Sequence, residues 1–246
     1  WERILYMQEK LGFDGTKLGA SFDPSYDASK PVWFAHKVEV KEAEKNGTKD
    51  ISSLKVTDGH SSLRDTWQVL WPISEFYAYS DQRTTNKNQN LAFLSVFDGA
   101  PFKNAPASNV DAKRNNDVKA DDAFSVASNI TNLMFENIST IHFDKKAGTL
   151  VDTFDGNKGT TVTVFDAAYS LEALRIFQRA IDALPVGYGS ADGAKSLESA
   201  QGKEALKLIK TQADFLIKNA KDKNGLYVSK IDIKTNQKSD LDLGTQ

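Results

Sequence analysis

The stretch TTVTVFDAAYSLEALRIFQRAIDALP, residues 160–185, changes within a few positions from alternating β-branched residues to a helical run. The alternation over 161–165 predicts a strand, and apolar residues around most of the circumference of 167–184 predict a helix buried on more than one side. Asp166 stands at the junction, where an aspartate can accept a hydrogen bond from an unpaired helix N–H group. We therefore favour a capping role for Asp166 and keep a functional carboxylate as the alternative.

The same order of helix, strand hairpin and aspartate recurs along the chain. Apolar residues at helical spacing predict helices at 62–79, 124–141, 167–184 and 205–220. Turn-rich sequences between apolar runs predict hairpins with arms at 32–40 and 51–57, at 150–154 and 161–165, and at 226–229 and 240–243. Three copies of one unit therefore fit most of the chain.

The segments VTDGHSSLRDTW (56–67), VTVFDAAYSLEAL (162–174) and SDLDLGTQ (239–246), together with this order, resemble the α/α-toroid proteins, such as six-hairpin glycosidases and epimerases. The resemblance implies a mainly α fold, a full or partial toroid of α/α-hairpins with short β-hairpins between outer and inner helices. It also implies that the loops entering the inner helices line a funnel that binds sugars, with acidic residues there acting as general acid and base.

We predict a single domain over residues 1–246, which would be a fragment of a longer chain. Trp1 already lies within a helical apolar pattern, and the chain ends where the next inner helix should begin. Residues 81–119 are rich in Asn, Lys, Ala and Pro, which predicts an irregular insertion.

Candidate site residues gather at the predicted hairpin exits. We assign Asp65 and Asp166 as candidate catalytic carboxylates. The candidate substrate-binding residues are Asp58, His60, Trp67, Tyr169 and Asp242.

Each candidate has a structural alternative. Ser62 and Asp65 fit a shortened capping box, His60 in a Gly-flanked turn fits a surface histidine, and Trp67 fits a core residue. Tyr169, one turn after Asp166, would serve as a platform on which a sugar ring stacks.

The composition argues against several other classes of function. The formal net charge is −2 and no basic stretch carries interleaved aromatic residues, which argues against a nucleic-acid partner. No apolar run approaches the roughly 20 residues of a membrane span. The chain has no cysteine, and His36, His60 and His142 are scattered in the sequence, so we predict neither a metal site nor a cofactor.

We therefore predict a carbohydrate-directed protein with a glycan ligand, acting as a glycoside hydrolase or sugar isomerase, in an extracytoplasmic location. The alternative is a non-catalytic extracytoplasmic scaffold that presents the loop 81–119 to a protein partner. A third hypothesis is a half ring that is inert alone.

Overall fold

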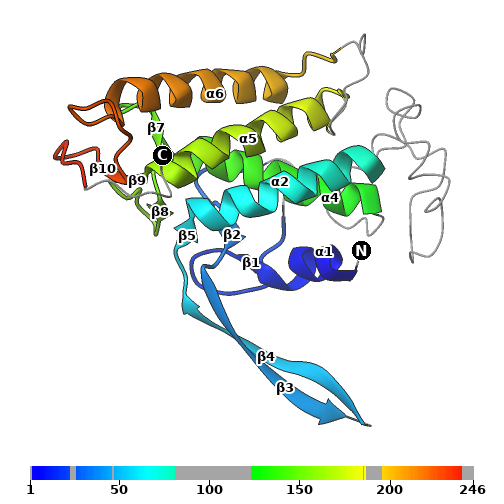
Figure 1. Ribbon diagram of the computed structural model, residues 1–246. Coiled ribbons are helices and arrows are strands. Elements are labelled where there is room, and N and C mark those ends of the chain that lie inside the picture. Colours follow the sequence, from blue (N-terminus) through cyan, green and yellow to red (C-terminus); the bar gives the residue numbers. More distant parts are fainter. Residues whose placement is uncertain are drawn as a thin grey trace.

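A computed structural model describes residues 2–22, 26–45, 47–80, 123–184, 186 and 196–239. Helices α2, α4, α5 and α6 run alongside one another, and a long strand hairpin projects away from them (Figure 1). The predicted insertion at 81–119 and Asp242 lie outside the described residues. None of the described helices is long and apolar enough to cross a bilayer.

The helices follow the predicted apolar patterns closely. Their bounds are Glu2–Tyr6 (α1), Leu63–Ser80 (α2), Ala123–Asn137 (α4), Val164–Ile181 (α5) and Ala200–Asn219 (α6), with π-helical turns at Met7–Leu11 and Ile138–His142. Helix α5 contacts α2 on one side and α6 on another. Because it is covered from two directions, it carries apolar residues around most of its circumference.

The strands form two-stranded antiparallel sheets. The pairs are β1 (Gly12–Phe13) with β2 (Trp33–Phe34), β3 (Lys37–Lys45) with β4 (Thr48–Asp58), β5 (Ser61–Ser62) with β8 (Thr153–Phe154), β6 (Phe143–Asp144) with β7 (Thr149–Leu150), and β9 (Thr161–Thr163) with β10 (Lys230–Asp232). Two of these pairs, β5–β8 and β9–β10, join segments that are far apart in the sequence.

The predicted mainly α fold, a toroid of α/α-hairpins, is wrong. The described residues contain five α-helices, and strands take up 24% of them against 47% in helices. The predicted hairpin between 150–154 and 161–165 is present only in part: the N–H of Asp152 donates to the carbonyl oxygen of Thr161 at 2.8 Å, but the ladder partner of β8 is β5 and that of β9 is β10. The order of helix, strands and helix is present in the chain, but β8 and β9 form their ladders with strands that are distant in the sequence, so the repeats are not closed units.

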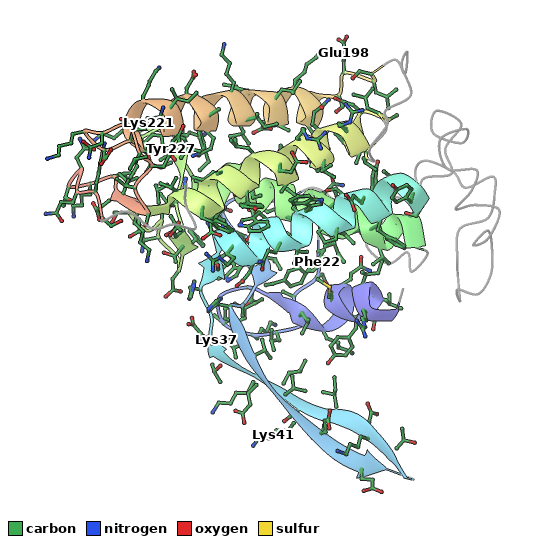
Figure 2. All side chains as sticks on the ribbon, viewed as in Figure 1. Phe22, Lys37, Lys41, Glu198, Lys221 and Tyr227 are labelled. Carbon is green, nitrogen blue, oxygen red and sulfur yellow. The ribbon has the colours of Figure 1, made fainter. Side chains whose placement is uncertain are left out.

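The main hydrophobic core lies between α2, α4 and α5. Leu70, Ile130, Leu174 and the stacked rings of Phe135 and Phe177 are buried there. Figure 2 shows Phe22 at the side of this core that faces α1. A second cluster, which includes Val164, Phe215 and Ile231, fixes the start of α5 against the end of α6 and β10.

The β3–β4 hairpin confirms the predicted arms in part: β4 contains the predicted arm 51–57, whereas β3 begins at Lys37, and Trp33 and Phe34 of the predicted arm 32–40 form β2 and pair with β1. Lys45 pairs with Thr48, and Gly47 has a positive φ of 77°, which a residue without a side chain adopts without strain. Lys37, near the base of the hairpin, and Lys41, farther along it, are both exposed (Figure 2). The base of the hairpin leads through Asp58 into β5 and α2, so its register positions the residues before α2.

His142 connects three of these segments in the interior. Its Nδ1 lies 2.9 Å from the carbonyl oxygen of Val151, and its Nε2 lies 3.0 Å from the hydroxyl of Ser61. Complete burial lowers the pKa of the imidazole from 6.5 to about 4. The ring is therefore neutral in the folded protein at pH 7, donating to the carbonyl and accepting from the hydroxyl.

This burial predicts a pH-dependent loss of stability. The unfolded chain protonates His142 near pH 6.5 and the folded chain only near pH 4, so its stabilising contribution is complete above pH 6.5 and declines as the pH falls toward 4. Between pH 7 and pH 5 the loss from this residue is about 2 kcal/mol. Urea unfolding of wild type and His142→Gln at both pH values measures it. Between pH 7 and pH 5, the free energy of unfolding of the variant should fall by about 2 kcal/mol less than that of wild type. An equal fall in both proteins would contradict the assignment.

Candidate functional site

The first turns of α2 and α5 lie next to each other. Each helix directly follows a short strand, and the first N–H of each helix is bonded to a neighbouring segment. The N–H of Leu63 donates to the carbonyl oxygen of Asp152 at 2.7 Å, and the N–H of Val164 donates to that of Ser229 at 2.9 Å. Asp152 immediately precedes β8, and β8 pairs with β5, the strand that leads into α2. Asp152 therefore lies between the starts of α2 and α5. Most of the residues predicted for the site lie at this place, which we call the α2–α5 rim.

Asp166 forms the central contact of the rim. Its Oδ1 accepts hydrogen bonds from Nε of Arg64 at 2.9 Å and from Nε1 of Trp67 at 3.1 Å, and its Oδ2 accepts from an Nη of Arg64 at 3.0 Å. The side chain of Asp166 is only 8% exposed, whereas that of Arg64 is 52% exposed. Such a bidentate, charge-assisted pair fixes the guanidinium plane. The contact raises the pKa of Arg64 further above its ordinary value.

The capping interpretation of Asp166 is wrong. Thr163 occupies the N-cap position of α5 without a side-chain cap hydrogen bond, and Asp166 lies three residues later. Its carboxylate receives side-chain donors from α2 instead of backbone N–H groups of its own helix. The charged pair between two helices is a tertiary contact that joins residues 102 positions apart.

An aromatic group covers the same contact. The rings of Trp67 and Tyr169 are stacked with centroids 5.3 Å apart. The ring of Phe165 also contacts Tyr169, with centroids 4.5 Å apart. Trp67 is buried, as its core interpretation predicted, while Tyr169 is 42% exposed. The guanidinium carbon of Arg64 lies 5.7 Å from the centre of the Phe165 ring. The solvent-facing aromatic surface of the rim is therefore provided by Tyr169.

Asp65 pairs with a histidine from the base of the hairpin. Its Oδ2 lies 2.6 Å from Nδ1 of His36, and both side chains are about one-third exposed. The hydroxyl of Ser62 accepts from the N–H of Asp65 at 3.4 Å, so half of the predicted capping box is present. The Asp65 carboxylate does not complete the box, because it binds His36.

Asp58 and His60 form a second pair beside the first. Oδ1 of Asp58 lies 2.6 Å from Nδ1 of His60, and this hydrogen bond is the largest cause of a lowered pKa for Asp58. The two imidazole rings, of His36 and His60, are 4.6 Å apart between centroids. His36 also donates its backbone N–H to the carbonyl oxygen of His60 at 3.1 Å.

The sequence analysis missed this approach of two histidines. His36, Asp58 and His60 offer donor atoms that all lie within 4.8 Å of one another, which is a group able to hold a metal ion. The signal was available in the predicted hairpin: its two arms are antiparallel, so His36 in one arm must lie beside the Asp58-Gly59-His60 segment that follows the other. Spacing along the sequence concealed this, since the two histidines are 24 positions apart.

Arg64 and Asp152 are the other rim residues that sequence reasoning left without a role. Asp152 accepts from both the N–H and the hydroxyl of Thr163 at 2.7 Å, yet burial raises its pKa above the ordinary value. The negative charge of Asp166 adds to this rise. Asp58, Asp65 and Asp166 thus lie at one end of the helix layer, together with a carboxyl group that retains its proton more readily than usual.

Two hollows lie elsewhere on the molecule. One, of about 770 Å³, is lined by Asp14, Gly15, Trp33 and the segment 154–156, among others, and the other, of about 670 Å³, lies beside the N-terminal half of α6. Gly15 and Gly156, which line the first hollow, both have a positive φ. Neither hollow is lined by a residue assigned to the site from the sequence.

Comparison of the chain with models of known protein families, with curated proteins and with solved structures gives no match. The function is therefore argued from the residues of the rim alone.

The Arg64–Asp166 pair predicts a measurable coupling between α2 and α5. Replacing Asp166 by Asn should lower the free energy of unfolding by about 2 kcal/mol, because the buried group loses a charge-assisted pair. In a double-mutant cycle with Arg64→Gln, the two changes should be coupled by about 1 kcal/mol or more.

Glu172→Gln is the matched control. Glu172 pairs with Arg175 on the exposed side of the same helix, and loss of a surface pair should cost less than about 1 kcal/mol. Additive effects of Asp166→Asn and Arg64→Gln in chemical denaturation would show that the pair contributes no interaction of its own.

Proposed function

We propose that the chain is a carbohydrate-directed protein whose sugar site lies over the α2–α5 rim. The observation that carries the proposal is the half-exposed ring of Tyr169, stacked on Trp67 beside the Arg64–Asp166 pair. Sugar rings present C–H faces that pack on aromatic rings and hydroxyl groups that need polar partners. An aromatic surface with a few fixed polar groups supports that combination.

Arg64 supplies the polar side of the proposed site. Its Nε and one Nη are occupied by Asp166, and the other Nη has no hydrogen-bond partner among the described residues. The pair with Asp166 holds the guanidinium in place, so the remaining donors would bind a hydroxyl with little loss of side-chain freedom. Asp166 acts in this proposal by positioning Arg64.

Asp65 is the carboxylate that we assign to proton transfer in hydrolysis or isomerisation. Its side chain is one-third exposed, and its Oδ2 lies 2.6 Å from Nδ1 of His36, a contact that orients the carboxylate. Burial raises the pKa of Asp152 above its ordinary value, which makes this residue our candidate for the general acid of glycoside hydrolysis. The predicted extracytoplasmic location belongs to the same proposal.

A glycan array followed by fluorescence titration tests the binding, with Trp67 beneath Tyr169 as the reporter. Tyr169→Ala should weaken sugar affinity about fivefold, since one stacked ring contributes about 1 kcal/mol. Tyr169→Phe keeps the ring and is the matched control, expected to retain most of the affinity. An array without any bound sugar, or equal affinity in Tyr169→Ala and wild type, would reject the carbohydrate proposal in favour of the scaffold hypothesis.

Turnover is measured separately on any sugar that binds. Asp65→Asn should reduce hydrolysis or isomerisation by about 10²- to 10⁴-fold while sugar affinity changes little. Glu75→Gln is a control on the same helix, because Glu75 bonds Trp71 away from the helix start. Unchanged turnover in Asp65→Asn would remove this residue from the chemistry and leave binding alone.

A further inference from the structure

The group formed by His36, Asp58 and His60 is a binding-site candidate distinct from the sugar-binding surface. Its members come from the two ends of one antiparallel hairpin: His36 immediately precedes β3, Asp58 ends β4, and His60 follows two residues later. The register pair Lys37–Asp58 and the backbone bond from His36 to His60 fix their separation. The sheet, and not a long loop, therefore sets the distance between the side chains.

We propose that His36, Asp58 and His60 form a binding site for a divalent transition-metal ion, for which zinc is the best fit. Two imidazoles and one carboxylate are a donor set that zinc accepts, with one position left for water or another ligand. Their donor atoms lie within 4.8 Å of one another. A tetrahedral zinc ion with bonds of 2.0–2.1 Å needs donors about 3.3 Å apart, so small rotations of the side chains suffice.

The neighbouring carboxylate Asp65 supports this assignment. Its Oδ2 lies 2.6 Å from Nδ1 of His36, which leaves Nε2 of that ring for the metal. A carboxylate that accepts the second N–H of a ligating histidine is a common feature of metal sites, because it fixes the tautomer and the ring orientation. Asp65 is then a positioning residue for the metal and not a ligand.

The charge and exposure of the group also suit a cation. Two carboxylates, Asp58 and Asp65, face two imidazoles, so the group is negative whenever both rings are neutral. The four side chains are between one-quarter and two-fifths exposed, which gives an ion and its water access to the site. Zinc would replace the hydrogen bond between Asp58 and His60 by two metal bonds.

Direct metal binding to the metal-free 246-residue chain tests the proposal. Isothermal titration with Zn²⁺ should show one site, and Co²⁺ should give the visible absorption of a tetrahedral ion with nitrogen and oxygen ligands. His60→Ala and His36→Ala should each weaken Zn²⁺ binding at least 100-fold, and Asp65→Asn should weaken it about 10- to 100-fold. Zinc should raise the melting temperature of wild type and not that of either histidine variant.

Asp50→Asn is the matched control, since Asp50 is an exposed aspartate of the same hairpin and lies away from the cluster. It should bind zinc as wild type does. Circular dichroism establishes that each variant is folded, and His36→Gln replaces His36→Ala if the latter is not. No zinc binding by wild type, equal binding by the histidine variants, or binding of Mg²⁺ or Ca²⁺ in preference to zinc would each overturn the proposal.

Tyr169→Ala separates the metal experiment from the sugar experiment, whereas Asp65 takes part in both proposals. Tyr169→Ala should bind zinc normally, because its ring contacts Trp67 and Phe165 and not the histidines. Zinc binding without any sugar response would leave the metal site standing and reject the carbohydrate function. Sugar binding without zinc binding would do the reverse.

Discussion

The bidentate contact between Arg64 and Asp166 is the interaction on which the arrangement of the rim depends. It joins the first turns of α2 and α5 through a carboxylate that is almost fully removed from solvent. A carboxylate in that position is costly unless its oxygens receive donors, and Arg64 and Trp67 supply three of them. Because Trp67 is held by the same carboxylate, the orientation of its ring and the position of Tyr169 above it follow from this contact.

The hairpin has a comparable role for the other half of the rim. Antiparallel pairing over β3 and β4 brings His36 next to the Asp58-Gly59-His60 segment, and the latter leads directly into β5 and α2. The side chains that carry the candidate chemistry are therefore placed by helix starts and strand ends. Sites built on such elements keep their geometry better than sites on long loops.

The sequence predicts where the helices and the long hairpin lie, but it does not predict which short strands pair with each other. Long apolar periodicities located α2, α4, α5 and α6, and the Asn46-Gly47 turn located the β3–β4 hairpin, since these signals are local. The strands of two or three residues carry no signal for a partner, so the pairing of β5 with β8 and of β9 with β10 was missed, and the toroid with it. Asp58, Asp65 and Asp166 were correctly placed at helix and strand ends. The donors that bind Asp65 and Asp166 lie 29 and 102 residues away, and no local pattern encodes such contacts.

The two proposals meet at Asp65. Its Oδ2 lies 2.6 Å from Nδ1 of His36, one of the residues of the proposed metal site. A metal ion on Nε2 of His36 would leave the N–H on Nδ1, where Asp65 accepts it and fixes the ring. The carboxylate proposed for proton transfer at the sugar site would then also orient a metal ligand, so the two proposed sites would share one side chain in the first turn of α2.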